Sequence, residues 1–226
     1  MNAAFIDLLE RNLRHADEYE SRFDGLQDGQ APDVVTVCCS DSRVLQDHMW
    51  GNDDPGTVFT CGNIGNRVTQ HTDDGPVVSG DLLYPIVHTD TRTAVVVGHT
   101  GCGAVTAAHD DLTEGRSEPP GIAACLDLLE GHLADGIDRL PAGLDREERI
   151  NRLVEYNVDR QIDALLESDH VPDDLTAIGV VYDFQDVYGG RRGEVSVINV
   201  DGETDVSILQ ETHSEIAQRI DRLWEP

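Results

Sequence analysis

The stretch Thr93-Ala94-Val95-Val96-Val97-Gly98-His99 decides the fold class of this chain. Its run of β-branched residues without charges is typical of a strand that is buried on both faces of a parallel sheet. A second run of this kind covers residues 33–39 and reads Asp-Val-Val-Thr-Val-Cys-Cys. In open α/β sheets, ligands bind outside the carboxyl ends of the strands. Both runs end in side chains that can bind metal, so we predict two strands of one sheet with equivalent carboxyl ends.

The segments around these strands alternate between helical and extended patterns. Helices are predicted over residues 3–23, 78–90, 103–110, 126–133, 150–166 and 208–224, and further strands over 57–60, 176–182 and 194–200. Strands that alternate with helices indicate an α/β fold with a mainly parallel central β-sheet flanked by helices. The length of 226 residues fits a single domain over 1–226, in which residues 1–30 form an N-terminal helical arm.

The charge of the chain is strongly unbalanced. It carries 44 acidic and 16 basic residues, a formal net charge of −28 at pH 7, and every basic residue is Arg. Such a charge repels nucleic acid and anionic membrane surfaces, so we predict neither as a partner. The acids are spread along periodic segments, which favours an acidic surface suited to molar salt, where screening acts over about 3 Å. We expect a halophilic, archaeal-type protein.

The cysteine content and the N-terminal segment both indicate a cytoplasmic protein. Five cysteines, an odd number, argue against a disulfide framework. Charged residues interrupt the apolar content of residues 1–23, which is unlike a signal peptide. No apolar run approaches the roughly 18 residues that a membrane-spanning helix needs.

Three side chains with metal-binding atoms lie at the ends of the two central strands: Cys39 after the first, and His99 and Cys102 after the second. Two thiolates and one imidazole suit a zinc ion whose fourth position is open. A structural zinc site would close that position with a further Cys or His in register, and the sequence offers no such CxxC or HxxxH partner. Cys38 points to the opposite side of the strand, so the register favours Cys39. We predict one Zn²⁺ per chain.

Two charged residues follow Cys39 at intervals of two. Asp41 is placed to accept a hydrogen bond from a metal-bound water and so to orient it. Arg43 is placed to hold Asp41 by a paired, charge-assisted contact that keeps the carboxylate ionised. A structural metal site needs neither residue, so this pair predicts catalysis.

The two motifs together resemble those of the β-class carbonic anhydrases, which carry Cys-x-Asp-x-Arg and then His-x-x-Cys. Residues 37–43 and 97–104 match the family signatures almost throughout, and weaker similarity extends over about 33–184. The chain departs from the family pattern in two places. Gly62 stands where an Arg is usual, and the stretch between Arg43 and Pro55, which contains Asp54, is one residue longer.

The resemblance implies the β-carbonic anhydrase fold and the reversible hydration of carbon dioxide to bicarbonate and a proton by zinc-bound hydroxide. Cys39, His99 and Cys102 would bind the zinc, and Asp41 and Arg43 would be catalytic. The family also has a resting form in which the Asp equivalent to Asp41 binds zinc directly, so an open and a closed site are both compatible with the sequence. The family further implies a homodimer or a dimer of dimers, with the N-terminal helix wrapped around the partner.

Other functions remain open at this stage. The same site could hydrolyse another small linear substrate, such as CS₂ or COS. A non-catalytic zinc-binding scaffold is a second alternative, although it would not need Asp41 or Arg43. A hydrolase with a cysteine nucleophile is a third, and two thiols that converge with one imidazole fit a metal better.

Overall fold

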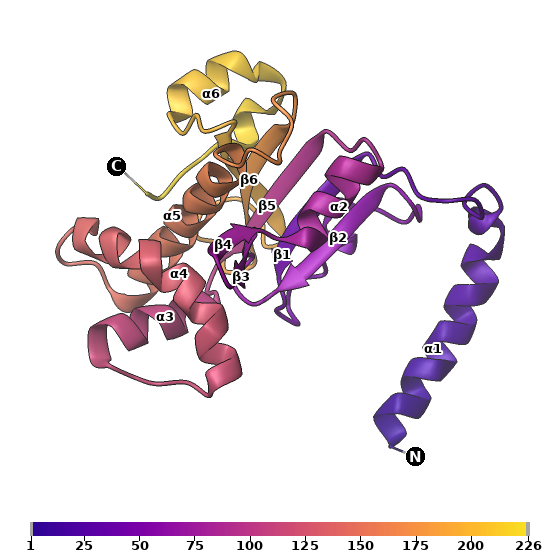
Figure 1. Cartoon of the computed structure of the whole chain (residues 1–226), viewed down its shortest axis with the longest axis horizontal. Helices are drawn as coiled ribbons and strands as arrows, with labels where there is room; N and C mark the ends of the chain where they lie inside the picture. Colours follow the sequence, from indigo (N-terminus) through magenta and orange to yellow (C-terminus); the bar gives the residue numbers. More distant parts are fainter. Residues whose placement is uncertain (1, 225–226) are drawn as a thin grey trace.

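The computed structural model describes residues 2–224 and contains a central five-stranded sheet (Figure 1). The strand order is β2-β1-β5-β6-β7. The strands are β1 (Val34–Cys39), β2 (Val58–Asn63), β5 (Thr93–His99), β6 (Thr176–Asp183) and β7 (Glu194–Val200). All neighbouring pairs are parallel except β6 and β7. The predicted mainly parallel sheet is therefore confirmed, and β1 and β5 lie side by side at its centre.

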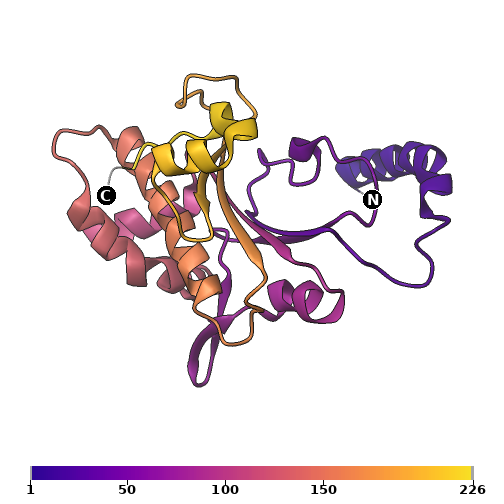
Figure 2. The same cartoon turned by 90° about the horizontal axis from the view of Figure 1, so that it is seen from above.

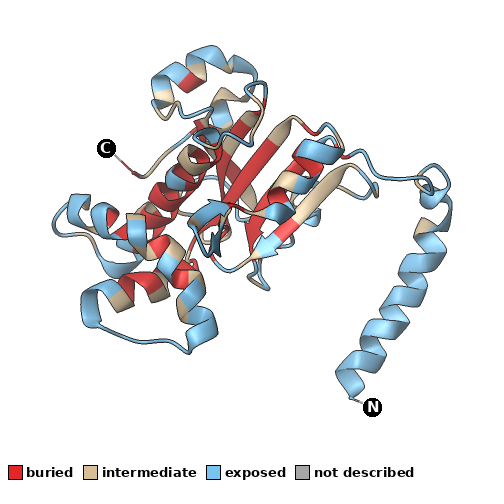
Figure 3. Cartoon of the chain, viewed as in Figure 1, coloured by how far each residue is buried: buried red, intermediate tan, exposed pale blue. Residues whose placement is uncertain are grey.

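Helices cover one face of this sheet and build the larger hydrophobic core. They are α2 (Gly80–His88), α3 (Gly103–Glu114), α4 (Pro120–Arg139) and α5 (Arg146–Leu166). Side chains of β1 that point to this face, such as Val35 and Val37, share a core cluster with Leu82 of α2 and Leu153 of α5. Figure 3 shows this buried layer in red. Gly98 in β5 lets α5 approach closely, because a Cβ there would lie 2.8 Å from Val154 and Val158.

The opposite face of the sheet carries a smaller cluster of buried residues. Its members are Cys38, Val95, Val97, Val180 and Val195. Met49 in the short 3-10 helix η2 (His48–Trp50) packs against it. The alternation along β1 thus sends Cys38 to this face and Cys39 to the other, as the strand register predicts.

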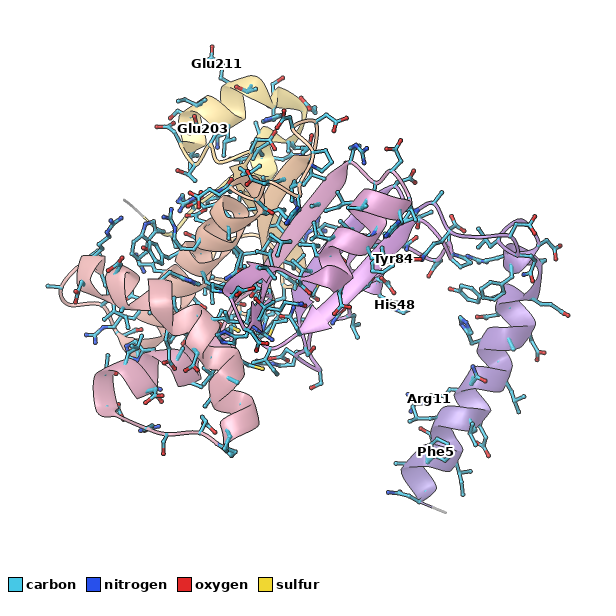
Figure 4. All side chains as sticks on the ribbon, in the orientation of Figure 1. Phe5, Arg11, His48, Tyr84, Glu203 and Glu211 are labelled. Atoms are coloured by element: carbon cyan, nitrogen blue, oxygen red, sulfur yellow. The ribbon has the colours of Figure 1, made fainter. Side chains whose placement is uncertain are left out.

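The N-terminal helix α1 (Ala3–Tyr19) continues into the 3-10 helix η1 (Glu20–Phe23) and extends away from the sheet (Figures 1 and 2). Every residue of α1 is exposed except Tyr19, which is half-buried. Figure 4 shows Phe5 on the arm well apart from Tyr84 on α2. Near the base of the arm, Arg22 donates a hydrogen bond of 2.7 Å to the Asp53 carbonyl.

Helix α4 (Pro120–Arg139) is longer than the predicted 126–133, and two other segments differ from the sequence prediction. The first is a hairpin of β3 (Thr69–Thr72) and β4 (Gly75–Val78), which the sequence analysis does not predict because neither strand shows a clear apolar alternation. The second is the C-terminal segment, for which the predicted helix over 208–224 is wrong. Helix α6 (Val206–Thr212) and the 3-10 helix η3 (Ser214–Arg219) precede an irregular segment there. The carboxylate of Glu155 binds the backbone N–H groups of Leu223 and Trp224 there, which competes with helical hydrogen bonding.

The sequence analysis predicts no apolar run long enough to form a membrane-spanning helix. Among the helices in the described residues, none combines the length and apolar character that crossing a membrane requires.

Candidate metal centre

The neighbouring ends of β1 and β5 bring three metal-binding side chains together. Cys39 is the last residue of β1, His99 is the last residue of β5, and Cys102 caps the N-terminus of α3. Their sulfur and nitrogen atoms all lie within 4.8 Å of one another, and all three residues are buried. The sequence analysis selected these same three residues, and the parallel pairing of β1 with β5 explains why residues 60 positions apart converge.

The geometry of the cluster fits a tetrahedral ion of the zinc type. The Cys39 and Cys102 Sγ atoms are 3.8 Å apart. Two thiolates at Zn–S distances of 2.3 Å and a tetrahedral angle would be separated by about 3.8 Å. The His99 Nδ1–H donates to the Thr100 carbonyl at 3.0 Å, which leaves the lone pair on Nε2. That Nε2 atom is buried and finds no hydrogen-bond partner within residues 2–224.

The contact between the two thiols shifts their pKa values in opposite directions. The pKa of Cys39 is lowered, chiefly because the Cys102 thiol donates a hydrogen bond to its sulfur. The same contact with Cys39, together with burial, raises the pKa of Cys102. These shifts favour the thiolate form at Cys39 over Cys102. A thiolate is the form of cysteine that binds metal ions.

Asp41 and Arg43 form a paired contact beside the cluster. Arg43 Nε donates to Asp41 Oδ1 at 2.9 Å, and an Arg43 terminal nitrogen donates to Oδ2 at 2.6 Å. These hydrogen bonds hold the pKa of Asp41 well below its usual range. Asp41 Oδ2 also lies 3.7 Å from His99 Nε2. The structure thus brings an ionised carboxylate to the edge of the three-residue cluster.

The loop between His99 and Cys102 is held by Arg43 and by two residues that the sequence analysis did not single out, Asn151 and Asp183. Gly101 N–H donates to the Asn151 side chain at 2.8 Å, and the Gly101 carbonyl accepts from Arg43 at 3.2 Å. The Thr100 hydroxyl donates to Asp183 at 3.3 Å. Asn151 is one of several polar residues that α5 buries, and a polar residue at a core position of an amphipathic helix is the signal that could have marked it.

The two departures from the family pattern lie in different environments. At Gly62, a Cβ would lie 3.0 Å from the Gln46 amide nitrogen and 3.3 Å from the Ser40 hydroxyl, so these side chains fill the space next to it. Asp54 instead faces the arm, where its carboxylate is 3.4 Å from Arg22. The longer segment before Pro55 therefore contributes to the attachment of the arm.

Comparison with known proteins identifies the family of this chain. A family model described as carbonic anhydrase matches residues 34–191. A carbonic anhydrase of Helicobacter pylori is 28% identical over 132 residues, which cover 56% of this chain and 58% of that protein. A carbonic anhydrase of Emericella nidulans is 37% identical over 136 residues, which cover 60% of this chain and 56% of that protein. The matches thus span less than two thirds of the length of these two relatives.

The solved structures agree with the sequence comparison. A structure of tetrameric beta-carbonic anhydrases from Sordaria macrospora superposes with a TM-score of 0.70 at 25% identity, covering 88% of this chain and 98% of that one. The family model covers most of the central sheet and both motifs that carry the buried cluster. The chain belongs to the β-class carbonic anhydrase family.

Proposed function

We propose that this protein catalyses the reversible hydration of carbon dioxide to bicarbonate and a proton, with one zinc ion per chain held by Cys39, His99 and Cys102. The observation that carries the proposal is the Asp41 carboxylate, fixed by Arg43, 3.7 Å from the unpartnered Nε2 of a buried His99. A scaffold site would not need an oriented carboxylate there. Membership of the carbonic anhydrase family supports the same reaction.

The roles of the chain's own residues follow from this arrangement. A zinc ion bound there would supply Lewis acidity that lowers the pKa of a coordinated water toward neutrality. Asp41 accepts a hydrogen bond from the attacking water at Oδ2, the oxygen near His99, and so orients its lone pair toward the carbon of CO₂. Arg43 keeps Asp41 ionised and oriented. The Thr100 carbonyl fixes the tautomer of His99.

The exposed arm supports an assembly of identical chains. Phe5, Leu8, Leu9 and Leu13 are between 46% and 67% exposed in α1. A single chain leaves this apolar face in water, which favours its burial against a second copy. We infer that residues 1–226 fold as one domain whose arm, residues 1–30, packs on a partner in a homodimer or a dimer of dimers. The tetrameric relatives from Sordaria macrospora support this inference.

The distribution of acidic side chains supports a requirement for salt. Among the described residues, four acids are buried: Asp110, Glu155, Asp159 and Asp183. The other described acids are at least partly exposed, which gives a highly charged surface for a chain with a net charge of −28. Screening by molar salt would reduce the repulsion among them. We infer that the protein folds and works best in concentrated salt.

The test is stopped-flow CO₂ hydration by zinc-loaded protein in molar KCl, between about pH 6.5 and 9. We expect rapid hydration that rises with pH and disappears when zinc is removed. Cys102→Ser should lose both the metal and at least about a thousandfold of the rate, because it removes a ligand. Cys38→Ser is the matched control, since Cys38 lies on the opposite face of β1 and should retain zinc.

A folded, zinc-replete protein that does not hydrate CO₂ would contradict the proposal. Hydrolysis of CS₂ or COS by that same sample would then assign the site to another small linear substrate.

A further inference from the structure

The aromatic ring of Phe184 contacts both halves of the candidate centre. The guanidinium carbon of Arg43 lies 4.5 Å from the centroid of this ring. The Phe184 and His99 rings are stacked, with centroids 5.7 Å apart and an interplanar angle of 26°. One side chain from the end of β6 therefore touches the cation that holds Asp41 and a candidate metal ligand. The reaction described above assigns no role to Phe184.

The backbone of Phe184 is tied to the loop that follows β5. Its N–H donates to the Thr100 hydroxyl oxygen at 3.2 Å, and that hydroxyl donates to Asp183. The Asp183 carboxylate also accepts the backbone N–H groups of residues 185–188, at 2.8 to 3.1 Å. This buried carboxylate fixes the turn after β6, and the turn fixes the position of the ring. The backbone hydrogen bonds thus fix the position of the Phe184 ring independently of Arg43.

Arg43 needs such a surface because its side chain is 51% exposed. A long exposed side chain populates many rotamers, and only a few of them place Nε and a terminal nitrogen on the two oxygens of Asp41. An aromatic face attracts a guanidinium and restricts the plane in which it lies. The contact with Phe184 therefore favours the rotamer in which two nitrogens of Arg43 donate to the two carboxylate oxygens of Asp41.

We propose that Phe184 is a positioning residue that acts through Arg43. Its ring holds the guanidinium in the plane that orients Asp41 toward the reacting water. This proposal rests on the proposed function, because it assigns Phe184 a part in the same reaction. It predicts that a flat aromatic face is needed at this position and that apolar volume alone is insufficient.

The first experiment compares Phe184→Leu with Phe184→Tyr. Leu keeps an apolar contact but removes the aromatic face, so kcat/KM for CO₂ hydration should fall about tenfold, equivalent to about 1.4 kcal/mol. Tyr keeps the face and should stay within about twofold of wild type. Phe59→Leu is the matched control, because Phe59 is a partly buried ring that packs against the main core and Tyr84. It should leave kcat/KM unchanged.

A double-mutant cycle tests whether Phe184 acts through Arg43. In an Arg43→Ala background, Phe184→Leu should lower kcat/KM by less than about twofold, because the group through which the ring acts is gone. A tenfold loss in both backgrounds would overturn the proposal. Loss of zinc from Phe184→Leu alone would also overturn it, since the ring would then act by supporting His99.

A spectroscopic readout separates this inference from the proposed function. In wild-type protein, the Arg43 Nε–H should give a ¹⁵N–¹H signal that is protected from exchange by its hydrogen bond to Asp41. Phe184→Leu should remove this protection, and Phe184→Tyr should keep it. If wild type does not hydrate CO₂ but the signal behaves in this way, the proposed function fails and the positioning role stands. If wild type is active and the signal is unchanged in Phe184→Leu, the positioning role fails alone.

Discussion

Helices α5 and α1 are both amphipathic, yet they meet opposite environments in this structure. Helix α5 has 21 residues and buries 12 of them against the sheet and its neighbouring helices. Helix α1 has 17 residues, of which only Tyr19 is even half-buried. The sequence of each helix spaces apolar residues along one face. Such spacing identifies an apolar face, but it does not identify the chain that covers it.

The two helices also differ in their relation to the candidate centre. Asn151 of α5 accepts from the Gly101 N–H, and Asn157 donates to the Gly65 carbonyl at 3.3 Å. Gly65 lies just after β2, whose last residue, Asn63, pairs with Cys39 of β1. Helix α5 therefore stabilises the core and positions both loops that surround the cluster. The arm, over residues 2–30, has no such contacts, so changes in the two helices should have separable effects.

The largest expected effect is that of Leu153→Ala in α5. Leu153 is fully buried, so the change leaves a cavity and should lower the free energy of unfolding by about 3 kcal/mol. Urea denaturation in molar KCl measures this loss, which should be the same at every protein concentration. Leu13→Ala in α1 makes the same substitution at an exposed position. The free energy of unfolding should change by less than about 0.5 kcal/mol in dilute protein. The change should increase with protein concentration if a second chain covers Leu13.

A smaller loss is expected for Glu155→Gln, also in α5. The Glu155 carboxylate accepts hydrogen bonds from the Tyr188 hydroxyl and from the N–H groups of Leu223 and Trp224. A Gln amide has a single acceptor oxygen, so buried donors lose their partner and the free energy of unfolding should fall by about 2 kcal/mol. Glu10→Gln on the exposed arm is the control and should change it by less than about 0.5 kcal/mol.

A comparison of wild type with Glu155→Gln at several pH values also tests the protonation of Glu155. Burial raises the pKa of Glu155 above its usual value of 4.5, so the folded protein binds this proton more tightly than the unfolded chain. The contribution of Glu155 to stability is therefore largest below that value and decreases as the pH rises through the raised pKa. The difference in unfolding free energy between wild type and Glu155→Gln should narrow over that interval. A constant difference would contradict the raised pKa.

Asn151→Ala should have an effect that is modest on stability and larger on metal retention. Loss of the acceptor for the Gly101 N–H should lower the free energy of unfolding by about 1 kcal/mol. The loop that carries His99 and Cys102 would then be less well held, and zinc should be lost to a chelator about tenfold faster. Asn151→Asp retains an acceptor oxygen and should stay close to wild type. Equal zinc loss from both variants would contradict this positioning role.

The smallest effect on the folding of one chain is expected from Leu9→Asp combined with Leu13→Asp. Both side chains are exposed in α1, so unfolding in dilute protein should change by less than about 0.5 kcal/mol. The mass in solution should nevertheless fall from that of an oligomer to that of a monomer, because charges would be placed on the face that a second copy covers. Light scattering measures this mass. An unchanged oligomer would show that the arm is not part of the interface.

The sequence predicts the central strands and the cluster because both depend on local signals. A β-branched run followed by a ligand residue occurs twice, and parallel pairing then brings Cys39 and His99 together. The turn after β6 was not predicted as part of the site. Asp183 and Phe184 reach Thr100 across more than 80 positions, and no spacing rule links residues so distant. The arm is an intermediate case, since its helix is predicted but its apolar face is not buried within the described residues of the chain.

The segment 222–224 supplies partners for two buried carboxylates of α5. The buried carboxylate of Asp159 in α5 pairs with Arg222, and Glu155 in the same helix binds the N–H groups of Leu223 and Trp224. These partners lie 63 to 69 positions after the carboxylates that they contact. A variant cut before residue 222 would leave Asp159 without its ion-pair partner and Glu155 without two backbone donors, and breaking a buried ion pair costs several kcal/mol. A truncation of a few residues from position 222 onward would therefore destabilise the centre of the domain, under α5.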